Sequence, residues 1–239
     1  MALTGIVFAV FFLNWLAVGF SWRRVKQITK PLAMILVIFW TLAAASWDVN
    51  TLLLLLVMAQ IFGLAGDVFL LLQSRWFLPG LGAFLMGHLF YISILGWCLF
   101  RGIRIMGFMS QWTGGIILSL GIWAVILTSF YGFVAPKSPR LTMPRALWIP
   151  IQVYGWVLSV LVILSMLVVI TEAIFTLPGL FLVLGAFLFY ISDSLLAYDR
   201  FKRKMPKVNV WIMVTYHLAQ FSLALGFLSC FGYGWGLFG

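Results

Sequence analysis

Two aspartates of this sequence lie inside long hydrophobic stretches, where carboxyl groups are rare. Asp193 falls in the stretch Gly185 to Tyr198, which is otherwise apolar except for the serines on either side of it, and Asp67 falls near the end of an earlier apolar stretch. An ionised carboxylate inside a membrane-spanning helix is costly unless it has a partner or trapped water. These two acids are therefore the first candidates for chemistry.

Both histidines of the chain, His88 and His217, also fall within apolar stretches. Counted at 1.5 Å per residue from the same end of the expected spans, the histidines lie ~15 and ~12 Å deep, and Asp67 and Asp193 lie ~7–8 Å deep. A single histidine in an apolar helix is as readily a hydrogen-bonded packing residue. Four titratable groups in one half of the membrane are more informative than any one of them, and together they predict a polar cavity between the helices.

Hydroxyl and amide side chains have the spacing or the depth to join these groups. Three-residue spacings place Tyr91 on the helical face of His88, and Tyr190 on the face of Asp193. Taken singly, each such side chain is as easily a hydrogen bond between two helices. The candidates for the lining of one polar cavity are Gln60, Tyr91, Tyr154, Tyr190, Tyr216 and Gln220.

Composition decides the class of protein. Of the 239 residues, 64% are hydrophobic and only 8% are charged, and the mean hydropathy is +1.15. Soluble domains carry about 25% charged residues. We therefore expect a polytopic membrane protein that occupies residues 1–239 as a single transmembrane domain, with the apolar N-terminal stretch retained as its first span.

Hydropathy divides the chain into eight expected spans, and spans of this length must be helices because lipid offers backbone groups no other partner. The fold class is therefore all-α, an eight-transmembrane-helix bundle. Pro31, Pro178 and Pro206 stand at or before expected span starts, whereas Pro150 lies inside a span and predicts a kink there. The expected spans are 4–21, 31–47, 51–72, 78–100, 112–133, 145–170, 176–198 and 209–232.

Lysine and arginine are distributed unequally between the connections. Thirteen of the fifteen lie in connections on one side of the expected bundle, and only Arg101 and Arg104 lie on the other. The positive-inside rule places the side with thirteen in the cytoplasm and both termini outside. The net charge of +10 is then explained by membrane topology, and nucleic acid is not an expected partner.

Several catalytic signatures are absent from the sequence. The chain has no GxSxG nucleophile motif, no HExxH or paired-cysteine zinc motif, and no glycine-rich phosphate loop. A metal site built from the two aspartates and two histidines is chemically conceivable because carboxylate and imidazole are ordinary ligands. With no signature for a metal or another group, we expect no cofactor.

Several motifs follow one another along the chain: Lys30-Pro31-Leu32, Gly66 to Leu70 (GDVFL), Gly82-Ala83-Phe84, Gly87 to Tyr91 (GHLFY), Tyr154, Gly185 to Ala197 (GAFLFYISDSLLA) and Tyr216 to Gln220 (YHLAQ). Taken in this order, they resemble the lysoplasmalogenase (YhhN-like) family of eight-span membrane enzymes. The resemblance covers nearly the whole chain, and the ordered set is more specific than any single motif. One departure is His217, where the family pattern more often has a tyrosine.

This resemblance implies hydrolysis of the vinyl ether bond of lysoplasmalogens, with release of a fatty aldehyde and a glycerophospho-base such as glycerophosphocholine or glycerophosphoethanolamine. The reaction needs an acid to protonate carbon, a negative group beside the resulting cation, and a base for water. Two neighbouring carboxyl groups in a low-dielectric site cannot both ionise easily. We therefore expect Asp67 and Asp193 to be the catalytic pair, with either one as the acid, and His88 to orient groups or move protons.

The remaining candidates would bind the lysophospholipid within its surrounding membrane lipids. Lys30, with Arg75, stands at the expected cytoplasmic mouth and is a candidate for holding the lipid phosphate, although membrane topology alone also explains a lysine there. Short loops favour a bacterial inner membrane as the location. The sequence leaves head-group preference and oligomeric state open. The expected substrate-binding residues are Lys30, Tyr91, Tyr154, Tyr190, Tyr216, His217 and Gln220.

Two other functions use the same residue types. A proton-coupled lipid or small-molecule transporter would use intramembrane aspartate and histidine as a proton relay, and discontinuous helices would favour it. A metal-dependent membrane lipid hydrolase would need those residues to converge on one ion. Both alternatives therefore depend on how the helices are built and where they bring these side chains.

Overall fold

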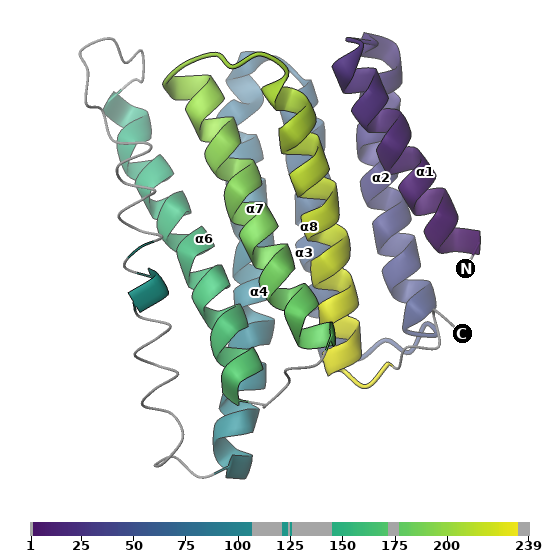
Figure 1. Ribbon diagram of the computed structural model, residues 1–239, viewed down its shortest axis with the longest axis vertical. Helices are drawn as coiled ribbons and strands as arrows, with labels where there is room; N and C mark the ends of the chain where they lie inside the picture. Colours follow the sequence, from purple (N-terminus) through teal and green to yellow (C-terminus); the bar gives the residue numbers. More distant parts are fainter. Residues whose placement is uncertain (1, 107–120, 124, 126–144, 172–176, 234–239) are drawn as a thin grey trace.

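The computed structural model describes residues 2–106, 121–123, 125, 145–171 and 177–233, and its secondary structure within these ranges is helical (Figure 1). The elements are α1 (Ala2–Gly19), α2 (Arg23–Ala44), α3 (Thr51–Leu71), a 3₁₀ turn η1 (Ser74–Trp76), α4 (Phe77–Met106), α6 (Arg145–Thr171), α7 (Leu177–Phe201) and α8 (Val208–Cys230).

Seven of these helices are long and apolar enough to cross a membrane. The prediction of an all-α polytopic membrane protein is confirmed, and seven of the expected spans correspond to α1–α4 and α6–α8. The expected span 112–133 lies outside the described residues, apart from residues 121–123 and 125.

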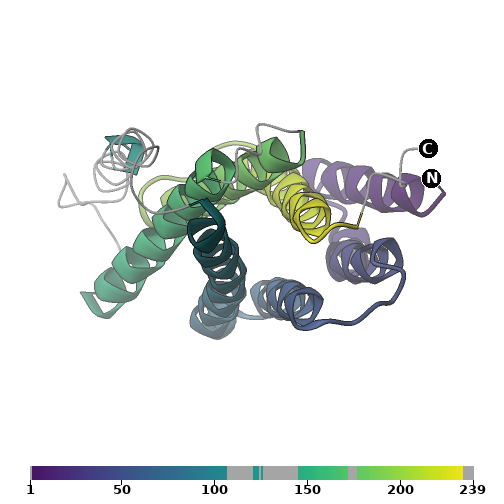
Figure 2. The same ribbon diagram turned by 90° about the horizontal axis from the view of Figure 1, so that it is seen from below.

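The helices form two layers, and α8 lies in one of them (Figure 2). Seen along the bundle in Figure 2, α6, α7, α8 and α1 follow one another on one side, and α4, α3 and α2 follow one another on the other. Helix α8 contacts α1, α2, α3 and α7, and 72% of its apolar window is buried, the largest share of any span described. Residues on α8 are therefore positioned by neighbours from both layers.

Helices α7 and α8 approach each other closely through reciprocal glycines. A Cβ atom on Gly185 of α7 would lie 2.9 Å from the backbone nitrogen of Leu223 and 3.1 Å from the carbonyl oxygen of Ala219. A Cβ atom on Gly226 of α8 would lie 2.9 Å from the backbone nitrogen of Leu182. Small residues that let backbones meet are typical of helix pairs in membranes. Here they fix the position of Asp193 along the axis of α8.

The second helix differs from expectation at its start. The sequence predicts a span from residue 31, but α2 begins at Arg23 and Pro31 lies inside the helix. Hydropathy detects only where the apolar surface begins, and the polar segment from Arg23 to Lys30 continues the helix past that point. Pro31 lacks only its own N–H, which forfeits one backbone hydrogen bond. Lys30 consequently lies within a helix and not in a loop.

The glycine contacts between α7 and α8 give a testable prediction. Gly185→Ala places a methyl group against backbone atoms, and we expect it to lower the free energy of unfolding in detergent micelles by about 1–3 kcal/mol, the usual cost of overpacking. The matched control is Gly96→Ala, because a Cβ atom there would meet no atom within 4 Å. Equal stability of the two variants would contradict the close packing of α7 on α8.

Candidate functional site

A polar cavity of about 260 Å³ opens between α2, α3, α4, α7 and α8. Its walls include both intramembrane acids, Asp67 from α3 and Asp193 from α7, together with Lys30, Phe84 and Tyr216. Two carboxyl groups that are 126 positions apart in the chain therefore face one shared space. This is the juxtaposition that chemistry with paired acids requires.

Lys30 forms a buried ion pair with Asp67. The ammonium nitrogen lies 3.0 Å from Asp67 Oδ1, and the two residues are 4% and 1% exposed. The sequence predicts Lys30 at the cytoplasmic mouth, and in the structure it lies within α2 as a buried part of the cavity wall. Its positive charge is engaged by Asp67.

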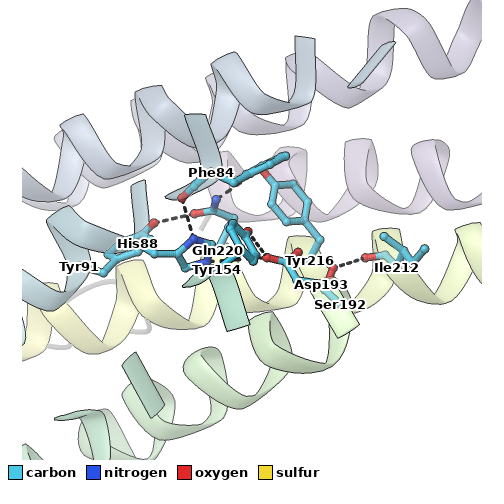
Figure 3. A network of polar contacts seen from close by, with 9 residues as sticks. All are labelled: Phe84, His88, Tyr91, Tyr154, Ser192, Asp193, Ile212, Tyr216 and Gln220. Carbon is cyan, nitrogen blue, oxygen red and sulfur yellow. Dashed lines mark hydrogen bonds and ion pairs between the residues drawn. The ribbon is translucent and has the colours of Figure 1, made fainter. Parts of the chain in front are cut away.

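Asp193 has two neighbours from other helices (Figure 3). The hydroxyl of Tyr154 on α6 donates a hydrogen bond to Asp193 Oδ2. Nε2 of His88 on α4 lies 4.0 Å from the same oxygen. That separation is too long for a direct hydrogen bond and suits a bridging water or a reacting group. Helices α4, α6 and α7 therefore meet at this carboxyl group.

The tautomer of His88 follows from its own helix. Nδ1 lies 2.6 Å from the carbonyl oxygen of Phe84, four residues earlier. A carbonyl oxygen only accepts, so Nδ1 must carry the hydrogen and donate it. In the neutral ring Nε2 then presents a lone pair, and among the described residues it has no hydrogen-bond partner. His88 therefore aims an acceptor at the space beside Asp193.

Behind the cavity, three polar side chains form a chain of hydrogen bonds (Figure 3). Tyr91 donates to Gln220 Oε1 at 2.6 Å, and Gln220 Nε2 lies 3.4 Å from the hydroxyl oxygen of Tyr216. Tyr216 lines the cavity, whereas the other two lie deeper and are almost fully buried. Tyr91 and Gln220 hold the wall that carries Tyr216.

Besides Tyr91 and Gln220, three further sequence-predicted polar residues lie away from the cavity lining. His217 accepts a hydrogen bond from Trp15 Nε1 at 3.0 Å through Nδ1 and stacks on Phe11 with ring centres 4.5 Å apart. Gln60 donates to Thr41 at 2.8 Å. Tyr190 is half-buried beside a small apolar cluster. The periodicity of a helix assigns each residue a face, but it does not say which neighbouring helix that face meets.

A narrow apolar pocket of about 20 Å³ shares wall residues with the polar cavity, among them Asp193 and Phe84. Its other walls come from α3, α4, α6 and α7 and include Leu81, Ile151 and Leu158. Tyr154, the hydrogen-bond donor to Asp193, also lines it. The carboxyl group of Asp193 therefore stands where an apolar compartment meets a polar one.

Phe84 belongs to the Gly82-Ala83-Phe84 stretch of the family resemblance, but it is not among the predicted site residues. Its ring packs against Gly66, where a Cβ atom would lie 2.7 Å from the ring, and it lines both compartments. The pairing of Gly66 with Asp67 on α3 was the available signal, because a glycine beside a buried acid leaves room for a neighbour. Only the packing of α3 on α4 identifies that neighbour.

The two alternative functions gain no support from this geometry. Within the described ranges, no three His, Cys, Asp or Glu side chains gather as ligands for one metal ion. Helices α3 and α7, which carry the two acids, run unbroken from Thr51 to Leu71 and from Leu177 to Phe201. The discontinuous helices that favour a transporter are therefore not found at either acid.

Fold and site together define a polytopic helical membrane protein with paired carboxyl groups in a buried polar cavity. Comparison with protein families matches residues 25–227 to the YhhN family, so the chain belongs to the YhhN family. This confirms the family resemblance drawn from the motifs.

Curated relatives agree with this assignment. The chain is 25% identical over 224 residues to the lysoplasmalogenase TMEM86B of Mus musculus. The aligned region covers 92% of this chain and 82% of the mouse protein. It is also 25% identical over 171 residues to the lysoplasmalogenase TMEM86B of Homo sapiens. This aligned region covers 71% of this chain and 62% of the human protein. No solved structure matches the chain significantly.

The buried ion pair gives the prediction for this site. Lys30→Met leaves Asp67 as a buried acid without its cation, and we expect a loss of about 3–5 kcal/mol in the free energy of unfolding, the usual cost of removing one partner of such a pair. The double variant Lys30→Met/Asp67→Asn removes the charge of both partners and should regain most of that loss. Additive losses in denaturation experiments would show that the two residues are not coupled.

Proposed function

We propose that this protein is a membrane hydrolase that cleaves the vinyl ether bond of lysoplasmalogens and releases a fatty aldehyde and a glycerophospho-base. The observation that carries the proposal is the shared cavity of Asp67 and Asp193, with its apolar pocket beginning at Asp193. The names of the mouse and human relatives support the same substrate class. The products would be glycerophosphocholine or glycerophosphoethanolamine, according to the head group.

The first step is protonation of carbon. The ammonium of Lys30, 3.0 Å from Asp67, stabilises Asp67 as the carboxylate. Asp193 is then the carboxyl group that carries a proton, since two neighbouring negative charges are unfavourable in a buried site. Asp193 gives this proton to the vinyl carbon that does not bear oxygen. The positive charge that develops on the C–O unit faces the carboxylate of Asp67 across the cavity.

The second step adds water and breaks the C–O bond. A water molecule beside His88 Nε2 and Asp193 Oδ2, which are 4.0 Å apart, attacks the oxocarbenium carbon. It gives one proton to Asp193, directly or by way of the His88 lone pair, and this restores the acid. The resulting hemiacetal collapses as its O–H proton is transferred to the glycerol oxygen, which leaves as an alcohol together with an aldehyde. No nucleophilic serine is needed.

The two compartments suit an amphiphilic substrate. The apolar pocket, with walls such as Leu81 and Leu158, would hold the start of the alkenyl chain, and the polar cavity would hold the glycerol. The vinyl ether oxygen would then lie beside Asp193, where the compartments meet. We propose that the chain forms one transmembrane domain in a bacterial inner membrane, with the basic end of the bundle in the cytoplasm and both termini outside.

The test is aldehyde release by the purified, full-length protein from a 1-alkenyl lysophospholipid. We expect Asp193→Asn and Asp67→Asn each to lower kcat by at least 10²-fold, the lower end of what general acid–base catalysis contributes. The control is Asp48→Asn, because Asp48 is exposed in the connection between α2 and α3. Circular dichroism and unfolding in the same detergent separate loss of chemistry from loss of fold.

Two results would overturn this proposal. One is retention of full activity in both aspartate variants, which would remove the carboxyl groups from the mechanism. The other is the absence of aldehyde from every vinyl ether lipid tested while the protein remains folded. A matched 1-acyl lysophospholipid gives a further check, because an acid site built for vinyl ethers should release no fatty acid from its ester.

A further inference from the structure

The polar cavity extends from the two acids to the end of the bundle where α1 joins α2 and α7 joins α8, at the top of Figure 1. Its walls there include four cationic side chains, and polar uncharged groups such as Ser74 and Asn209. The cationic residues are Lys26, Lys30, Arg200 and Lys204. A cavity with this many cations beside a membrane surface is suited to an anion, and the charges that the protein itself neutralises decide where the anion binds.

Two of the four cations are already paired within the chain. Lys30 contacts Asp67 at 3.0 Å, and Lys204 contacts Asp199 Oδ2 at 2.7 Å. Asp199 also accepts the backbone N–H of Met205 at 3.0 Å, so the Lys204 pair closes the connection between α7 and α8. These two lysines therefore serve the structure and are not the cations that remain for a ligand.

Lys26 and Arg200 have no carboxylate within ion-pair distance among the described residues. Lys26 lies one turn before Lys30 on α2, and its side chain is partly buried in the cavity wall. The guanidinium of Arg200 lies over the ring of Phe77, 4.9 Å from its centre. Stacking on a ring orients a guanidinium while leaving its N–H edge free to donate.

The positions of these cations along their helices match an extended amphiphile. Arg200 follows Asp193 by seven residues, two turns on the same face of α7, or ~10 Å of helix rise. The Cα–Cβ bond of a helical residue tilts toward the N-terminus, which for Arg200 is the direction of Asp193. Glycerol places its phosphate three carbons from the ether oxygen. A substrate with its ether at Asp193 would direct its phosphate toward Arg200 and Lys26.

We propose that Lys26 and Arg200 form a phosphodiester-binding subsite for the head group of the substrate, in place of Lys30. This inference rests on the proposed function, since it takes the position of the ether from it. Bidentate guanidinium contacts and an ammonium charge are the usual means of holding a phosphate. The subsite recognises the phosphodiester, which choline and ethanolamine head groups share.

Paired substrates test the subsite. One is 1-alkenyl-glycerophosphocholine, and the other is the corresponding 1-alkenylglycerol, which lacks the phosphate. For Lys26→Gln and Arg200→Gln we expect KM for the phosphate-bearing substrate to rise about tenfold or more, with kcat changed by less than about twofold. A tenfold rise corresponds to about 1.4 kcal/mol of binding. The effect on the alkenylglycerol should be much smaller, because it has no phosphate to lose.

The control variant is Arg24→Gln, which removes one charge from the same end of α2. Arg24 is exposed and does not line the cavity, so a general effect of surface charge on lipid binding would appear in this variant as well.

Inhibition by glycerophosphocholine and by inorganic phosphate distinguishes the lipid head group from free phosphate as the anion that the subsite binds. Competitive inhibition by glycerophosphocholine, weakened in the Lys26 and Arg200 variants, supports the head group. Inhibition of equal strength by inorganic phosphate would assign the subsite to free phosphate and overturn the proposal.

Binding without turnover keeps this inference separate from the proposed function. A 1-alkyl ether lysophospholipid has no vinyl group and cannot be cleaved by the proposed route, but it retains the chain, glycerol and phosphate. If the wild type binds it more tightly than Lys26→Gln and Arg200→Gln do, the subsite stands even if no aldehyde is ever released. Equal binding by all three proteins, or equal KM changes for both paired substrates, would overturn it.

Discussion

The cost of holding charge in a low-dielectric interior governs the arrangement of this bundle. Asp67 is almost fully buried in a membrane-spanning helix, and the ammonium of Lys30 lies 3.0 Å from its carboxyl oxygen. Burying the two ions separately would cost several kcal/mol each. Because α2 continues through Pro31, Lys30 is part of a helix of the bundle and reaches Asp67. The other groups of the site, including Asp193, take their roles around this pair.

Close helix packing keeps the paired acids in one cavity. Gly87 of α4 allows the carbonyl oxygen of Ala59 on α3 to approach, since a Cβ atom there would lie 2.9 Å from that oxygen. The next residue, His88, lies on a different side of α4, where its ring contacts Tyr154 of α6 and Phe189 of α7. Gly185 likewise allows the backbones of α7 and α8 to approach closely. Without a strong hydrophobic force between helices in lipid, such backbone approaches are a main source of association.

The site is divided into a polar and an apolar part, and Asp193 belongs to both. This division supports the proposal of an amphiphilic substrate, which has a polar and an apolar part. It also separates tasks among the basic residues: Lys30 and Lys204 are engaged by Asp67 and Asp199, whereas Lys26 and Arg200 are proposed to bind the phosphate. Residues of one chemical type thus have different functions because their partners differ.

The sequence alone determined the fold class, most of the spans, the family, and the two acids. These follow from apolar length, from the rarity of carboxyl groups in lipid and from ordered motifs, all of which are local properties. Tertiary structure decided which polar groups meet. His217 has a spacing suited to the site, yet its face meets Trp15 and Phe11 of α1. Lys30 is drawn inward to Asp67 because α2 starts eight residues before its apolar stretch, and such pairings between distant helices depend on packing that no local pattern encodes.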